Sequence, residues 1–250
     1  MKIANIYPVA NQLLYKDETY VMILAHLVKD NRYFKENFNF TNQYVIMDNG
    51  LFEKAQVSTS LLDCVLLAQR SSIAVAEIII PDAVNDPGRT IELFLENLDT
   101  IRKYGDMYTF MFVAQANDEH ELEQMIDFIN RYNLPLSVGI SKLCPFDRAS
   151  DEAIRIYRKC VHPIHILGIK KTFAELDKLA DVKQIRGCDT SQLAFMDKNN
   201  VQTTETNCDV HNYYRKGEDI DLAKDVCDNV NLIRLKLEEQ ELLKKYGILR

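Results

Sequence analysis

Three aspartates and one glutamine stand at the ends of short apolar runs along this chain. They are Asp48 in VIMDNGLFE, Asp82 in IIIPDAVND, Gln115 in TFMFVAQ and Asp189 in IRGCDTSQL. Carboxylates that meet at one site suit glycosidic chemistry, since one can attack the anomeric carbon while another handles the proton on the leaving or entering group. The residue types therefore indicate acid/base or glycosyl-transfer chemistry, and composition does not name the substrate.

The neighbours of two of these aspartates suggest their roles. Thr190 and Ser191 can donate hydrogen bonds to Asp189 and keep its carboxylate ionised near neutral pH, which suits a nucleophile. The glycine of the MDNG stretch lets the backbone come close to a ligand beside Asp48, and Phe52 is expected to form a wall of that pocket. Each aspartate taken alone is equally typical of a strand end or a helix N-cap.

Gln115 and two glycines extend this set of strand ends. A buried amide without a partner is costly, so Gln115 is expected to face a cavity or a polar partner. Gly139 in LSVGIS and Gly168 in HILGIKK end further apolar runs. Either glycine can leave a backbone N–H exposed to bind a carbonyl oxygen, or can serve only for close packing.

The chain alternates strand-like runs with helical patterns. The seven runs are Ile3 to Tyr7, Tyr44 to Asp48, Ala76 to Asp82, Tyr108 to Gln115, Leu136 to Ser141, Ile164 to Lys170 and Ile185 to Asp189. Regular βα repetition with nearly continuous Val, Ile and Leu strands predicts a parallel sheet covered on both faces. We expect an α/β fold, a TIM-type (β/α)8 barrel, whose chemistry sits at the carboxyl ends of its strands.

The eighth strand of such a barrel is not evident, and residues 201–206 are its weak candidate. A doubly wound open sheet is the alternative fold, because βα repetition alone does not say whether the sheet closes. No GxGxxG or Walker A sequence follows the first run, which removes the commonest nucleotide-binding reasons to prefer that alternative.

Helical spacing of apolar residues predicts the helices between these runs. Residues 16–30 have such spacing, and further helices are expected over residues 58–71, 90–104, 118–132, 150–160 and 173–180. Asn117, Asp118 and Ser150 are candidate N-caps. Residues 220–250 read as a C-terminal helical segment that either packs on the barrel or mediates a homodimer. No linker divides the chain, so residues 1–250 are expected to form one domain.

Composition narrows the class of protein. The formal charge of −7 over 250 residues argues against a surface that binds nucleic acid everywhere, but it allows a local basic groove. Six cysteines without a CxxC pair indicate neither a zinc knuckle nor a thioredoxin motif, and favour a reduced, cytoplasmic protein. The apolar stretches are far shorter than the roughly 20 residues that span a bilayer, so no membrane association is expected.

Taken in order from about Val45 to Asp189, the motifs resemble those of the tRNA-guanine transglycosylase superfamily. MDNGLFE corresponds to that family's Asp-Ser-Gly-Gly-Phe-Gln-like motif at a strand end. VAQAN corresponds to its Val-Gln-Gly motif, with Ala116 in place of the glycine. SVGIS is similar to its Gly-Gly-Leu-Ala-Val-Gly segment, and HILGIKK to its Leu-Met-Gly-Val-Gly strand.

The resemblance implies a role for each matched residue. Asp48 would be the general acid/base, and Asp189 the nucleophile that attacks C1′ of a nucleoside and releases guanine. Asp82 would recognise the base, Gln115 would contact its guanine-like edge, and Gly139 would donate a backbone hydrogen bond to its carbonyl.

Departures from the family pattern point to a particular branch. The tRNA enzymes carry a zinc site of closely spaced cysteines and a histidine, whereas Cys208, His211 and Cys227 lack that spacing, so no metal is expected. The chain looks most like the short, zinc-less bacteriophage enzymes, which would act in the host cytoplasm. They place a 7-deazaguanine, such as the cyano form preQ0 or the aminomethyl form preQ1, into DNA without a cofactor.

Three alternatives stay open. The same exchange on tRNA needs the same pocket, a non-catalytic nucleic-acid-binding subunit of such an enzyme would share the fold, and an unrelated barrel enzyme could act on a small metabolite.

Overall fold

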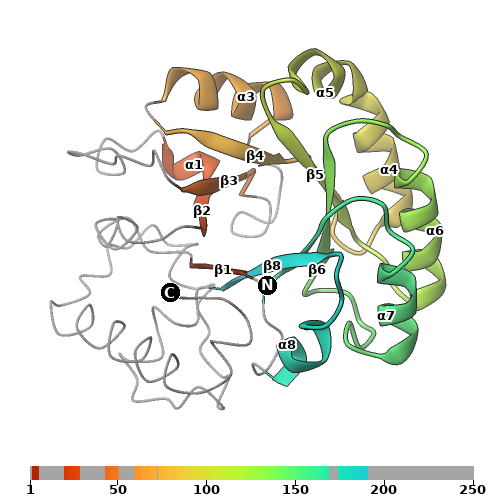
Figure 1. The fold of residues 1–250 in the computed structure, drawn as a ribbon. Coiled ribbons are helices and arrows are strands. Elements are labelled where there is room, and N and C mark those ends of the chain that lie inside the picture. The colour runs from red at the N-terminus through yellow and green to blue at the C-terminus, as the bar shows by residue number, and fades with distance from the viewer. Residues whose placement is uncertain are drawn as a thin grey trace, which may run out of the picture.

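The computed structural model describes residues 2–5, 20–28, 43–50, 59–71, 73–168 and 174–190. Eight parallel strands in chain order form a closed barrel, in which β8 pairs with β1 (Figure 1). The strands are β1 Lys2–Asn5, β2 Tyr20–Leu24, β3 Tyr44–Asp48, β4 Val75–Ile79, β5 Thr109–Ala114, β6 Leu136–Ser141, β7 Ile164–Leu167 and β8 Ile185–Thr190. The expected (β/α)8 barrel is confirmed, and the open doubly wound sheet is wrong.

The helix predicted over residues 16–30 is wrong in its central part. Tyr20–Leu24 is strand β2, and only Ala25–Val28 is helical, as α1. All five strand residues are buried, and they pair with β3 from Tyr20 opposite Tyr44 to Leu24 opposite Asp48. A strand buried on both faces has an apolar run without alternation, which cannot be told from a buried helix by periodicity. This is the missing eighth strand. The barrel closes without residues 201–206, which lie outside the described residues.

The helices that follow the strands pack against the outside of the barrel (Figure 1). They are α3 Leu61–Arg70, α4 Pro87–Glu96, α5 Leu98–Tyr104, α6 Glu119–Ile129, α7 Asp151–Tyr157 and α8 Ala174–Leu179. The predicted caps Asp118 and Ser150 are confirmed, because their side chains accept hydrogen bonds from the backbones of Glu121 and Ala153. Asn117 is not the cap. No helix of the described residues is long and apolar enough to cross a membrane, and the segment 220–250 lies outside them.

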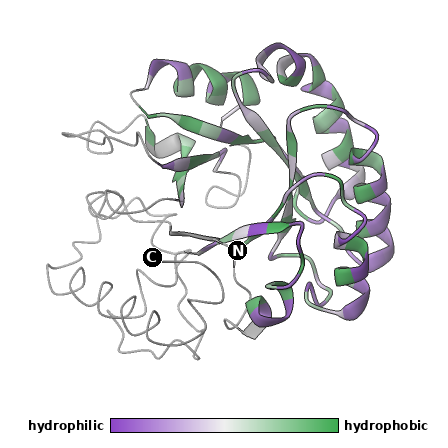
Figure 2. Cartoon of the chain, viewed as in Figure 1, coloured by the Kyte–Doolittle hydropathy of each residue, from purple (hydrophilic) through white to green (hydrophobic). Residues whose placement is uncertain are grey.

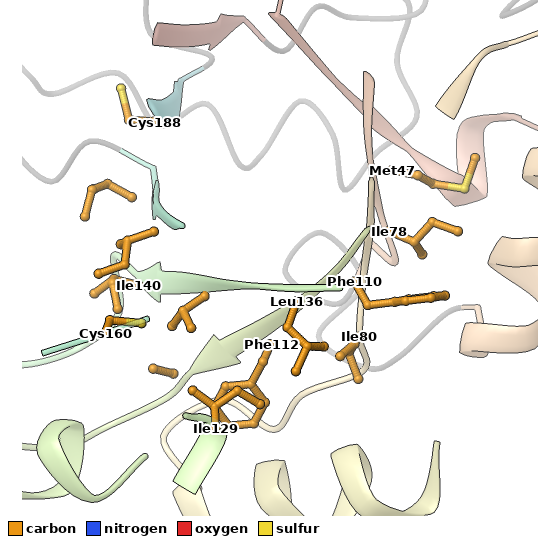
Figure 3. Packing of buried hydrophobic residues seen from close by; sticks show 14 of the residues in the cluster. Met47, Ile78, Ile80, Phe110, Phe112, Ile129, Leu136, Ile140, Cys160 and Cys188 are labelled. Atoms are coloured by element: carbon orange, nitrogen blue, oxygen red, sulfur yellow. The ribbon is translucent and has the colours of Figure 1, made fainter. Parts of the chain in front are cut away.

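The apolar core lies mainly between the strands and these helices. Figure 2 shows hydrophobic faces turned toward the sheet and hydrophilic faces outward. In that layer Phe94 of α4 meets Phe112 of β5 edge to face, with ring centroids 5.6 Å apart, and Figure 3 shows Phe112, Phe110 and Ile129 among the packed residues. A smaller cluster of Tyr20, Met22, Ile46, Ile79, Met111 and Val113 fills the barrel interior. The strands are therefore fixed from both sides.

Charged groups also lie inside the barrel, in its amino-terminal half. Glu77 of β4 is fully buried and forms an ion pair with Arg186 of β8. Ser137 of β6 donates to the same carboxylate, and Arg186 donates to the Tyr44 hydroxyl over 3.0 Å. The pair links strands on opposite sides of the barrel. A buried charge is tolerated only with such compensation.

Removing one partner of this pair should be strongly destabilising. We expect Arg186→Met to lower the free energy of unfolding by about 3–5 kcal/mol, because Glu77 is then buried without its counter-charge. The double variant Glu77→Leu/Arg186→Met should recover much of that loss. Urea unfolding measures both, and Arg89→Met, which removes exposed ion pairs to Glu92 and Glu96, is the control. An effect of Arg186→Met no larger than that of the control would contradict this account.

Candidate active site

The residues predicted from strand ends do gather at one end of the barrel. Asp48 ends β3, Gln115 follows β5, Gly168 follows β7, and Asp189 is the penultimate residue of β8. Asp82 comes shortly after β4. Because all eight strands are parallel, these positions share the carboxyl-terminal face, where barrel enzymes carry out their chemistry. Phe52 lies outside the described residues, so its predicted place in the pocket wall stays a prediction.

Asp189 is buried, and its carboxylate is held on one oxygen. Oδ1 accepts a hydrogen bond from the backbone N–H of Gly168 at 3.0 Å and lies 3.0 Å from Nε2 of His165. Thr190 and Ser191, the donors expected from the sequence, have side chains outside the described part of the chain. The backbone N–H of Gly168 donates to Asp189, not to a carbonyl oxygen, and the predicted contact of Gly168 with a substrate stays a prediction.

A register shift between β7 and β8 turns Asp189 inward. Ile164 pairs with Ile185, whereas His165 pairs with Gly187, so Arg186 is an extra residue on β8. Side chains alternate between the faces of a regular strand, so residues three apart would point to opposite faces. The extra residue resets that alternation. Arg186 and Asp189 can therefore both face the barrel interior.

His165 and Tyr20 continue the hydrogen bonding inward from Asp189. The hydroxyl of Tyr20 lies 2.8 Å from Nδ1 of His165. His165 has no exposed surface and Tyr20 is almost fully buried. Burial raises the pKa of the Tyr20 phenol well above its usual value, so the hydroxyl stays protonated. Sequence reasoning missed both residues, although a histidine within the apolar run IHIL was a visible signal.

Arg148 holds the backbone around Gly168 in place. Its guanidinium is fully buried and donates to the carbonyls of Ile140, Leu167 and Gly168 at 2.7–3.0 Å. It also binds both oxygens of Glu175 on α8. These contacts use all five donors of the arginine fork. The ends of β6 and β7 are thereby joined to α8, which fixes the N–H that Gly168, at a positive φ of 63°, offers to Asp189.

Asp82 and Gln115 form a second buried polar group at this face. Gln115 Nε2 donates to Asp82 Oδ2 over 2.5 Å, which confirms the polar partner expected for Gln115. Burial raises the pKa of Asp82 to about 6, while hydrogen bonds from Gln115 and Asn49 act in the opposite direction. Gln115 Oε1 is buried and has no hydrogen-bond partner among the residues that the structure describes. An acceptor in this state can take a hydrogen bond from a bound water or a ligand.

Asp48 has a different environment, since it is only partly buried. Its Oδ1 accepts a hydrogen bond from the N–H of Gly50 at 3.2 Å, and Gly50 has a positive φ of 78°. This conformation suits glycine and closes a tight turn directly after β3. Asp48 is therefore bound to the turn that follows it and keeps some contact with solvent, while its predicted acid/base role stays a prediction.

Gly139 is placed differently from the other predicted residues. It lies inside β6, opposite Val113 and His165, two residues before the strand ends at Ser141. A Cβ atom there would come within 2.7 Å of Leu167 and 2.9 Å of Met111. Of the two uses considered for this glycine, the structure provides the packing one, while its predicted contact with a base carbonyl stays a prediction.

Four of the cysteines lie in the described ranges, and metal sites can be described only there. Cys64, Cys144, Cys160 and Cys188 are buried. Within those ranges no group of three or more His, Cys, Asp or Glu side chains is arranged to hold a metal ion. Cys208, His211 and Cys227 lie outside them.

Comparisons with known proteins support the fold and nothing finer. No family model and no curated protein matches the sequence. Among solved structures, the chain is similar to β-methylaspartase from Clostridium tetanomorphum, a magnesium complex, with a TM-score of 0.50 and 10% identity over 94% of this chain. The chain spans 59% of that protein's length. N-acetylneuraminate lyase from Proteus mirabilis is a weaker match, with a TM-score of 0.41 and 14% identity over 97% of this chain and 85% of that one.

The raised pKa of Asp82 predicts a pH-dependent stability. The folded protein binds this proton with a pKa of about 6 rather than 3.8, so between those values it holds more protons than the unfolded chain. Its free energy of unfolding therefore falls as pH rises through this window, by about 3 kcal/mol in total. Asp82→Asn should remove that decline and be more stable than wild type at pH 7.5.

Urea unfolding at intervals from pH 4 to pH 8 measures this effect as the difference between the two proteins. Asp106→Asn makes the same chemical change at an exposed position and is the control. If the curves of wild type and Asp82→Asn run parallel across the range, Asp82 does not carry the raised pKa.

Proposed function

We propose that this chain is a base-exchange transglycosylase, which replaces guanine in DNA with a 7-deazaguanine derivative through a covalent bond between the sugar and Asp189. The observation that carries the proposal is the arrangement at the carboxyl-terminal face. An oriented carboxylate, Asp189, shares that face with a buried Asp82–Gln115 pair that has an unsatisfied acceptor. The first group suits attack on a sugar, and the second suits recognition of a base.

The Asp82–Gln115 pair matches the edge of a guanine. A guanine or 7-deazaguanine presents N1–H and a 2-amino group, which are donors for a carboxylate or an amide oxygen. Asp82 is ionised above pH of about 6 and accepts such hydrogen bonds, and Gln115 Oε1 is the second available acceptor. Rejection of a base that lacks these donors is expected to be strong, because it would leave buried acceptors unpaired.

The exchange needs two displacements at C1′. In the first, an oxygen of Asp189 attacks C1′, and the bond from C1′ to N9 breaks with its electron pair going to the guanine, which takes a proton from Asp48. In the second, Asp48 removes the N9 proton of the incoming 7-deazaguanine, whose N9 attacks C1′ and releases the Asp189 carboxylate. The two steps balance without a redox cofactor, and configuration at C1′ is retained.

The choice of DNA over tRNA rests on the resemblance to short, zinc-less members. In a duplex the target base must leave the helical stack to reach this pocket, at a cost of a few kcal/mol. An anionic chain with a net charge of −7 needs a local concentration of Lys and Arg to bind either polymer. The polymer is therefore best decided by direct comparison.

Exchange of radiolabelled guanine, and of preQ0 and preQ1, into DNA and into tRNA tests the proposed function. We expect incorporation into DNA, reduced by at least about a thousandfold in Asp189→Ala, because the nucleophile is lost. Incorporation into tRNA alone would show that the same exchange reaction has tRNA as its substrate. Absence of exchange on both with the purified chain, and its appearance only with a partner protein, would identify a non-catalytic subunit.

Base discrimination tests the role of Asp82 separately. Wild type should favour guanine over hypoxanthine, which lacks the 2-amino group, and Asp82→Asn should reduce this preference by roughly tenfold or more, since a charged hydrogen bond is lost. The measurement is kcat/KM for each base in the exchange reaction, with Asp106→Asn as the surface control. If the preference for guanine is unchanged in Asp82→Asn, Asp82 does not recognise the base.

A further inference from the structure

We propose that His165 is a positioning residue for Asp189 and that Tyr20 sets its tautomer. The inference rests on the proposed function for its catalytic meaning, but the hydrogen-bond chain itself stands on contacts within the barrel. Tyr20 comes from β2, His165 from β7 and Asp189 from β8, so the chain crosses the barrel interior from one side to the other.

The direction of each hydrogen bond follows from the groups at its two ends. An ionised carboxylate only accepts, so His165 must carry its proton on Nε2 to bind Asp189 Oδ1. The Tyr20 hydroxyl then has two options at Nδ1, to donate or to accept. Within the described residues His165 Nδ1 is the hydrogen-bond partner of this hydroxyl. A buried hydroxyl that accepted there would leave its own proton unpaired, which is costly.

Tyr20 therefore donates to Nδ1, and His165 is a neutral imidazole with its proton on Nε2. This tautomer gives Asp189 a donor without placing a second positive charge beside it. Since Gly168 donates to the same oxygen, Oδ1 is held from two directions. Both hydrogen bonds to this carboxylate from the described residues end on Oδ1, which leaves Oδ2 as the oxygen that attacks C1′.

Positioning of this kind has a specific kinetic effect. Rotation of the carboxylate moves Oδ2 away from the line of attack, and a misplacement of about 1 Å can cost on the order of a hundredfold in rate. The base itself is bound by Asp82 and Gln115, at other strand ends. Loss of His165 should therefore reduce kcat while leaving KM for the base nearly unchanged.

Four variants separate positioning from a purely structural role. We expect His165→Leu to reduce kcat by roughly a hundredfold, and His165→Gln to recover part of it, since a glutamine amide can donate to Asp189 while its oxygen accepts from Tyr20. Tyr20→Phe should reduce kcat by about tenfold. Tyr44→Phe is the matched control: it removes a phenol that stacks on Tyr20 with centroids 5.5 Å apart, but whose hydroxyl binds Arg186. Its kcat should stay at the wild-type value.

Nitrogen NMR of the imidazole in the resting protein reads the tautomer without any substrate. The result expected at pH 7.5 is a neutral ring protonated on Nε2 in wild type, with a detectable Nδ1–H population in Tyr20→Phe. An imidazolium or an Nδ1–H ring in wild type would overturn the inference, as would wild-type kcat in His165→Leu or an equal loss in Tyr20→Phe and Tyr44→Phe. If wild type exchanged no base at all, the proposed function would fail, while the NMR result would still decide the direction of the hydrogen bonds.

Discussion

The fixed position of the Asp189 carboxylate is the constraint on which the candidate site depends. A carboxylate inside a barrel needs donors, and those donors need fixed backbones of their own. Here the N–H of Gly168 reaches Asp189 because Arg148 binds the carbonyls of Leu167 and Gly168 and ties them to Glu175 of α8. Burying an arginine is costly unless its donors are satisfied, and here all five donors of Arg148 bind strand-end carbonyls or Glu175.

Two polar layers inside the barrel differ in a way that separates stability from function. In the amino-terminal layer the carboxylate of Glu77 is paired with Arg186 and Ser137. At the opposite end, burial raises the pKa of the Asp82 carboxyl to about 6, because its neighbour in the described part of the chain is an amide rather than a cation, and Gln115 Oε1 has no partner there. A carboxylate buried without a cation, with a raised pKa, is typical of a functional site, whereas a buried carboxylate paired with a cation is typical of the core.

Much of the fold could be predicted from the sequence, because the parallel strands from β3 to β8 have distinct apolar runs and the helices between them have clear caps, such as Asp118 and Ser150. Strand β2 could not, since all of its residues are buried and its spacing also fits a helix. Asp82, Gln115 and Asp189 were found because each ends or follows a strand.

His165, Tyr20 and Arg148 were missed for a physical reason. Tyr20 lies far from Asp189 in the sequence, and only the closed barrel brings β2 near β8. His165 reaches Asp189 from the neighbouring strand β7, and Arg148 acts on it only through the backbone at Gly168. The inward direction of Asp189 depends on the extra residue Arg186 in β8, which a regular alternation of side chains does not anticipate. Gly139 was identified by its position near a strand end, but the neighbours Leu167 and Met111 account for the absence of a side chain there.

The central claim is that Asp189 becomes covalently bound to a sugar. Its most direct test is to incubate the protein with guanine-containing DNA without an incoming base, denature it, digest it, and locate any nucleotide adduct by mass spectrometry. The account predicts an adduct on the peptide that carries Asp189 and its absence in Asp189→Asn. An adduct on the peptide that carries Asp48 instead would contradict it. So would exchange of guanine for an added 7-deazaguanine by a protein that forms no adduct.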